Sequence, residues 1–134
     1  MRALLALIKL EKKEIEKISA YRQSLVSTLA SYKEELEDLK TGYDKEMSKY
    51  GSLELSFFLE GYVTKVKNTE LKLRESINAI KNEIEAKTNE LKEHFENLKR
   101  FEILQDAHNK KRQTEVLKNE RKTNEEFVRV KILE

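Results

Sequence analysis

The sequence contains no cysteine, no proline and no tryptophan, and only three of its 134 residues are glycine. Without cysteine the chain can form neither a disulfide framework nor a thiolate zinc site. Folds built from many short elements need turns, and turns depend heavily on glycine and proline. The scarcity of both residues therefore excludes β-sandwiches, β-barrels and doubly wound sheets, and it leaves a chain of very long helices.

Hydrophobic residues are also scarce, at 38% against the roughly 45–50% of an ordinary domain, while charged residues reach 39%. The 27 basic and 25 acidic residues are interspersed, so no basic stripe predicts a nucleic-acid partner. The apolar run from Ala3 to Ile8 is too short for a signal peptide or for a membrane span of ~20 residues. We therefore expect a cytoplasmic protein.

Apolar residues recur at alternating spacings of three and four along the first part of the chain, a heptad pattern typical of a coiled coil. We call these positions the seam. Only Glu11, Arg22 and Glu46 interrupt the apolar series at these positions, which are Leu4, Ile8, Glu11, Ile15, Ile18, Arg22, Leu25, Leu29, Tyr32, Leu36, Leu39, Tyr43, Glu46 and Tyr50.

A second seam follows, with the same spacing, and ends abruptly at Phe101. Its positions are Leu59, Val63, Val66, Glu70, Leu73, Ile77, Ile80, Ile84, Lys87, Leu91, His94, Leu98 and Phe101. Beyond Phe101 the same phase meets only polar residues, although the residue types still favour helix.

The two seams predict an all-α fold, a two-helix antiparallel coiled-coil hairpin with a longer second helix. We place the first helix at about 2–50, the turn near Gly51 at about 50–56, and the second helix at about 57–130. The whole chain, 1–134, is then one coiled-coil domain with an unpaired extension from about 102. The matching register sets Leu29 opposite Ile77, Tyr43 opposite Val63 and Glu11 opposite His94.

No pattern predicts an enzyme. The chain lacks a glycine-rich phosphate loop, and its two histidines, His94 and His108, lie roughly 21 Å apart on one helix. They cannot share a metal ion, so we expect neither a metal nor a cofactor. A polar seam residue such as His94 commonly fixes register; pH sensing and ligand binding are the alternatives.

Two surfaces are candidates for partner binding. The consecutive Phe57, Phe58 and Leu59 either pack at the tip of the hairpin or form an exposed apolar patch. The extension carries apolar residues that have no intramolecular partner in this register, which favours burial against another protein over a solvated helix end. They are Ile103, Leu104, Val116, Leu117, Phe127, Val128, Val130 and Ile132.

The layout of a long helical hairpin with a longer second helix, together with a pattern in its C-terminal part, resembles the FliJ family of flagellar type III export proteins and the related YscO-type injectisome proteins. The pattern covers residues 51–128. It comprises Phe101-Glu102-Ile103-Leu104-Gln105-Asp106, then Glu115, and then Asn119-Glu120-Arg121-Lys122-Thr123-Asn124-Glu125-Glu126-Phe127.

The resemblance implies a non-enzymatic stalk, similar to the central stalk of rotary ATPases, whose terminal ends enter and stimulate the hexameric export ATPase. It also implies contacts with the cytoplasmic domain of the export-gate membrane protein and with export chaperones, and peripheral membrane association only through these partners. The implied ring contacts are Phe101, Leu104, Gln105, Asp106, Arg112, Glu120, Arg121 and Phe127. The implied gate contacts are Tyr62, Val66, Thr69 and Leu73.

Two other functions fit a long coiled coil. One is a helical chaperone subunit of prefoldin type, although the segment 50–58 is too short and too poor in glycine and asparagine for the β-hairpin of such proteins. The other is a homodimeric coiled-coil scaffold in which the long helices pair between chains.

Overall fold

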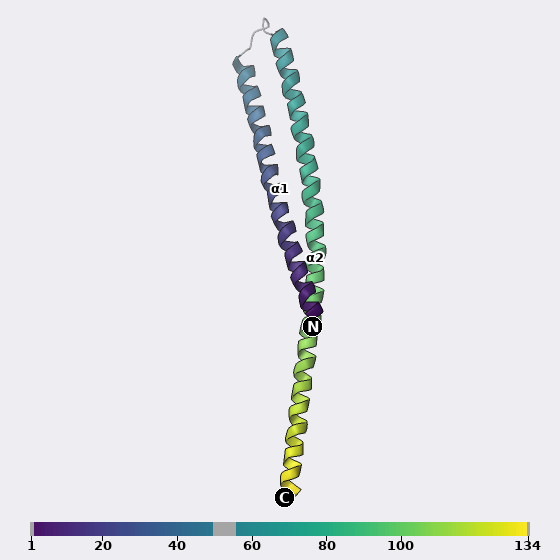
Figure 1. Ribbon diagram of the computed structural model, residues 1–134. Coiled ribbons are helices and arrows are strands. Elements are labelled where there is room, and N and C mark those ends of the chain that lie inside the picture. Colours follow the sequence, from purple (N-terminus) through teal and green to yellow (C-terminus); the bar gives the residue numbers. More distant parts are fainter. Residues whose placement is uncertain (1, 50–55, 134) are drawn as a thin grey trace. The chain divides into compact units, whose positions relative to one another are not determined.

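The computed structural model describes residues 2–49 and 56–133, which form two helices. Helix α1 comprises Arg2–Lys49 and helix α2 comprises Ser56–Leu133, with 48 and 78 residues (Figure 1). The predicted turn at 50–56 lies outside this range except for Ser56, and so do the side chains of Phe57 and Phe58. The predicted fold class, a two-helix hairpin with the longer helix second, is confirmed.

The helices run this long because nothing in the chain interrupts them. There is no proline to remove a backbone donor, and two of the three glycines, Gly42 and Gly61, lie inside the helices. Each glycine costs ~1 kcal/mol relative to alanine in a helix interior. That cost is small beside the packing of the two helices against each other, which supplies most helical stability in proteins, so the helices continue through both positions.

Contacts divide the chain into two compact units. The first unit combines Met1–Ile15 with Glu93–Glu134. In it Ile8 is 6% exposed and Leu4 and Ile15 are half-buried. On α2 the half-buried positions continue to Phe101 and Gln105, and every residue from 106 to 131 is exposed. We call residues 106–131 the tail.

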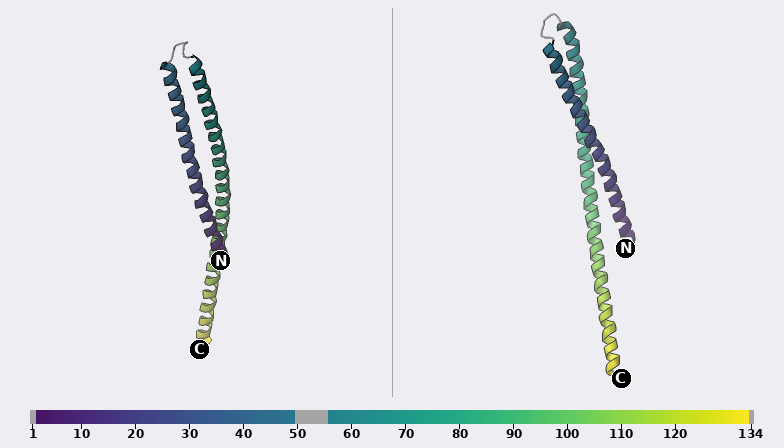
Figure 2. Two further views of the ribbon diagram at one scale, coloured as in Figure 1. Left: turned by 45° about the horizontal axis from the view of Figure 1, so that its top comes forward. Right: turned by 90° about the vertical axis from the view of Figure 1, so that its left-hand side faces the viewer.

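The second unit is Glu16–Lys92 and pairs the rest of α1 with the first part of α2. Ile18 and Ile77 are 8% and 7% exposed. The rings of Tyr43 and Tyr62 stack with centroids 6.4 Å apart and an interplanar angle of 8°. The views in Figure 2 agree that these stretches of the two helices lie side by side.

Every described seam position is buried or half-buried, in both helices. Ile8, Ile18 and Ile77 are nevertheless the only described hydrophobic residues that are buried rather than half-buried, and even they remain 6–8% exposed. Full burial of such a side chain contributes about 1.5–3 kcal/mol. A two-stranded coil cannot enclose its core, so most of the stability comes from many half-buried seam residues together.

Candidate functional site

The polar seam residues Glu11 and His94 contact each other, as the predicted register requires. His94 Nδ1 lies 2.6 Å from Glu11 Oε2, and the two side chains are 28% and 17% exposed. An ionised carboxylate can only accept a hydrogen bond, so Nδ1–H is the donor. This pair links α1 to α2 within the first unit and specifies which residues face each other there.

A group of polar contacts links α1 to α2 within the second unit. The Tyr21 hydroxyl donates to Glu83 at 2.6 Å, and Arg22 Nε donates to Thr88 at 2.9 Å. Lys87 Nζ lies 5.3 Å from the centre of the Tyr21 ring and 3.2 Å from Glu90. The hydrogen bond and the negative charge of Glu83 raise the pKa of Tyr21. These contacts fix side chains on the helix surface, and none of them positions a nucleophile beside a base.

The described residues hold no group of three or more potential metal ligands. Nor does any helix in the ranges 2–49 and 56–133 carry a stretch that is long and apolar enough to cross a membrane.

The candidate gate contacts do not share one environment. Val66 and Leu73 are half-buried at their seam positions, and Tyr62 is half-buried beside Tyr43. Thr69 alone is exposed, and its hydroxyl donates to the Lys65 carbonyl at 2.9 Å. Of the four residues only Thr69 is exposed, and the other three are half-buried where the two helices pair.

The candidate ring contacts separate into two groups. Phe101 and Gln105 are half-buried at the end of the seam. The other members are exposed, and two of them are large apolar residues, Leu104 at 56% and Phe127 at 62%. The exposed polar members are Asp106, Arg112, Glu120 and Arg121.

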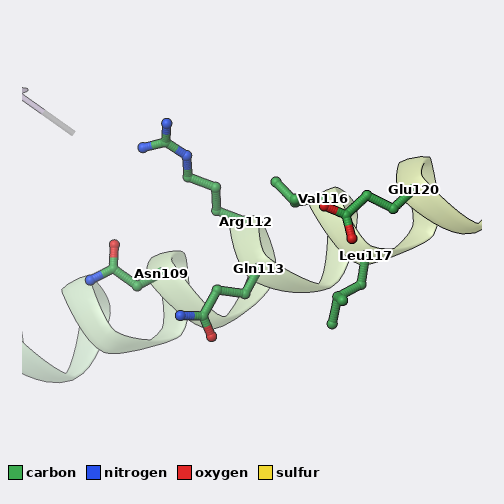
Figure 3. A pocket seen from close by; sticks show the side chains of 6 residues that line it. All are labelled: Asn109, Arg112, Gln113, Val116, Leu117 and Glu120. Carbon is green, nitrogen blue, oxygen red and sulfur yellow. The ribbon is translucent and has the colours of Figure 1, made fainter.

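Two apolar side chains of the tail, Val116 and Leu117, help to line a shallow depression along the helix. Its lining residues are Asn109, Arg112, Gln113, Val116, Leu117 and Glu120 (Figure 3). Val116 is 50% exposed and Leu117 is 60% exposed. Val116 and Leu117 therefore present apolar surface among charged and amide groups, and no other described element covers it.

A third group of exposed apolar residues lies at the start of α1, and the seam analysis missed it. Leu5 and Leu7 are each 43% exposed and Leu10 is 59% exposed. The sequence alone could have identified these leucines as exposed, because they fall between the seam positions Leu4, Ile8 and Glu11.

Comparison with known proteins identifies a family. The family model described as "Flagellar FliJ protein" matches residues 1–133. No curated protein and no solved structure matches the chain significantly.

Proposed function

The chain belongs to the flagellar FliJ protein family, whose members serve flagellar protein export, and on that premise we propose that it is the stalk of the export ATPase. In this proposal one coiled-coil domain, 1–134, enters and stimulates the hexameric ATPase. It also links the ATPase to the export gate and to export chaperones. It acts in the cytoplasm and needs neither a cofactor nor catalytic residues of its own.

The exposure of the tail is the observation that carries the proposal. Residues 106–131 are exposed throughout, and Val116, Leu117 and Phe127 are 50–62% exposed. A lone polar helix is marginally stable in water, and apolar residues on it gain free energy when a partner buries them. The interior of a ring of subunits offers such burial to a single helix.

The mechanism is mechanical and allosteric. A stalk that binds one state of the hexamer more tightly than another shifts the population toward the favoured state. A single helix cannot contact six identical subunits equally, so it also distinguishes among them. The export gate and the chaperones bind the paired part of the chain and through it act on the ATPase.

A truncation tests the stalk assignment. Removal of residues 103–134 should abolish stimulation of the purified ATPase, while helicity per residue and the unfolding temperature of the hairpin stay close to those of the full chain. Unchanged stimulation would reject the assignment.

A pair of substitutions locates the contact within the tail. Val116→Ser combined with Phe127→Ser should weaken stimulation strongly, because both side chains lie on one face of the helix. Lys118→Ala, on the opposite face, is the matched control and should stimulate normally. Equal loss in both variants would contradict a specific apolar contact.

The proposed gate contact rests on Tyr62 and Thr69. Thr69→Ala and Tyr62→Ala should weaken binding to the gate's cytoplasmic domain without lowering helicity. Val66→Ala should lower the unfolding temperature as well, since Val66 is half-buried in the seam. A loss of helicity in the first two variants would assign them to the core instead.

Sedimentation distinguishes the stalk from a homodimeric scaffold. The seams of α1 and α2 bury each other within one chain, which favours a monomeric hairpin. A concentration-independent dimer would support the scaffold.

A further inference from the structure

The spacing of the second seam returns in the tail, displaced by one residue. Continued in phase from Phe101, the seam meets seven tail positions, and five of them are charged. These positions are His108, Arg112, Glu115, Asn119, Lys122, Glu126 and Arg129. The residue that directly follows each of them belongs to a second series, which has the same alternating spacing and only one charge in seven. We call this series the tail stripe. It comprises Asn109, Gln113, Val116, Glu120, Thr123, Phe127 and Val130.

The rest of the tail is much more highly charged than the tail stripe. Of the other nineteen residues between 106 and 131, twelve are charged. A charged helix with one nearly uncharged line at heptad spacing is typical of a helix that pairs with another helix. Val116, Phe127 and Val130 supply the apolar side chains of this line and are 50%, 62% and 58% exposed. No described element covers them.

The tail stripe lies on the side of α2 that already packs in the first unit. At about 100° per residue, Val116 and Phe127 point within about 40° of Leu98 and Gln105, which are half-buried seam residues. Two shallow depressions follow the same line, with four and three tail-stripe residues in their linings, and Figure 3 shows the first. A partner helix placed along the tail stripe would therefore continue the line of pairing that α1 begins in this unit.

Glu120 decides which kind of helix can pair with the tail stripe. It occupies a central position, where pairing would remove it from water, and a carboxylate taken out of water needs a cation beside it. The tail stripe contains no basic residue. Two copies of this chain, paired along their tail stripes, would thus leave both Glu120 carboxylates without a cation in the facing stripe. The occupant is therefore a helix of another protein that places a lysine or arginine opposite Glu120.

We propose that the tail stripe pairs with one α-helix of the export ATPase, in a coiled-coil contact with a basic residue opposite Glu120. The proposal rests on the proposed function, and it adds which side of the tail is bound and what kind of element binds it. From Asn109 to Val130 the tail stripe is ~32 Å long, about three heptads. Loops that line a ring would not require a spacing of three and four, whereas a facing helix does. The opposite face of the tail stays in water.

Spin labels on single introduced cysteines test the proposal directly, because the chain has no cysteine of its own. The mobility of each label in the full-length protein is measured by electron paramagnetic resonance, before and after addition of the purified hexameric ATPase. The ATPase should immobilise labels on the tail stripe and leave labels on the opposite face mobile. The tail-stripe labels replace Gln113, Val116, Thr123 or Phe127, and the opposite-face labels replace Thr114, Lys118, Lys122 or Glu125.

The label pattern distinguishes failure of this proposal from failure of the stalk assignment. Immobilisation on both faces overturns the proposal, since the tail is then enclosed by the ring and not paired along one side, while the stalk assignment stands. Mobile labels at every position, with the ATPase present, reject the stalk assignment and the proposal together.

Adjacent apolar residues provide a matched pair of variants. Val116→Ser with Phe127→Ser, on the tail stripe, should raise the protein concentration for half-maximal ATPase stimulation by about tenfold or more. Leu117→Ser with Val128→Ser should raise it by less than about threefold. Leu117 and Val128 are 60% and 53% exposed, but Figure 3 shows Leu117 pointing to a different side of the helix from Val116. Equal losses in the two variants, at unchanged helicity, overturn the proposal.

Charge reversal tests the cation expected opposite Glu120. Glu120→Lys should weaken stimulation by about tenfold or more, because two cations would then face each other in the contact. Glu125→Lys makes the same change in charge on the opposite face and should stimulate almost normally. If both reversals weaken stimulation equally, the net charge of the tail matters and not a pair at Glu120, and the proposal fails.

Discussion

The paired stretches of the two helices and the tail are built from the same kinds of residue, yet they bury very different amounts of side chain. In α1 and in α2 as far as Gln105, every described seam position is at least half-buried. Between residues 106 and 131, no residue is even half-buried. The tail does not lack apolar residues, but it places them as adjacent pairs, Val116-Leu117 and Phe127-Val128. Spacing, more than composition, decides which part of this chain pairs with itself.

Polar contacts differ between the same two regions. In the paired stretches, side chains connect α1 to α2, as in Tyr21 with Glu83 and Glu11 with His94. In the described part of the tail, the contacts are local. Thr114 and Thr123 donate to carbonyls one turn earlier, and Lys131 lies over the ring of Phe127. Among the described residues, the side-chain contacts of the tail thus lie within the tail itself.

Introducing a carboxylate into each region should give the largest difference between them in the loss of unfolding free energy. Ile77→Asp puts a carboxylate at a position that is 7% exposed, and it should lower the free energy of unfolding by on the order of 4 kcal/mol. Val116→Asp, at 50% exposure, should change it by less than about 0.5 kcal/mol. Thermal and urea unfolding followed by circular dichroism measure both. Similar losses would mean that the tail is packed in the free protein.

The two histidines allow a second comparison. A double-mutant cycle of Glu11→Ala and His94→Ala should give a coupling of roughly 1 kcal/mol, because the hydrogen bond is charge-assisted but partly exposed to water. His108→Ala, in the tail, should leave the unfolding free energy unchanged. A coupling near zero would mean that Glu11 and His94 do not help to fix the register.

Glycine and alanine exchanges probe helix propensity in both regions. An added Cβ at Gly61 meets nothing within 4 Å, so Gly61→Ala should stabilise the hairpin by about 0.5–1 kcal/mol. Ala107→Gly should reduce total helicity without moving the unfolding midpoint of the hairpin, since the tail does not share in its packing. A shift of the midpoint in the Ala107 variant would show that the two regions unfold together.

The smallest expected effect is a titration. Glu83 raises the pKa of Tyr21 above its usual value of 10.0. Since the folded pKa is the higher one, the stabilising contact is complete below the pKa of the unfolded chain and is lost as pH rises through the folded value. Glu83→Gln should lower the titration midpoint of Tyr21 in spectra of ring-labelled protein, and the neighbouring Glu85→Gln should not. A midpoint unaffected by Glu83→Gln would contradict the hydrogen bond.

The sequence predicted the hairpin well because a heptad pattern records the pairing of helices directly. It placed Glu11 opposite His94, which the structure confirms, and it ended the second seam at Phe101, one seam position before the last half-buried residue, Gln105. The ring of Tyr43 also stacks on that of Tyr62, a contact that the predicted pairing of Tyr43 with Val63 did not include. A seam fixes the level at which two helices meet, but it does not predict every neighbour that an aromatic side chain contacts there.

The candidate surfaces were less predictable from the sequence. Val66 and Leu73 serve the seam, so a contact surface carried over from a family overlapped with the core. The exposed Leu5, Leu7 and Leu10 were overlooked because a search for regular spacing passes over apolar residues between seam positions. Their exposed fractions, and not their spacing, identify them as a surface.

Hydrogen exchange of backbone amides tests the central claim, that the tail is unpaired until the export ATPase binds it. In the free protein, amides of residues 106–131 should exchange rapidly, and seam amides around Ile18 and Ile77 should be protected. Addition of the purified hexameric ATPase should slow exchange in the tail selectively. Protection of the tail in the free protein, or no change in it when the ATPase is added, would contradict the account.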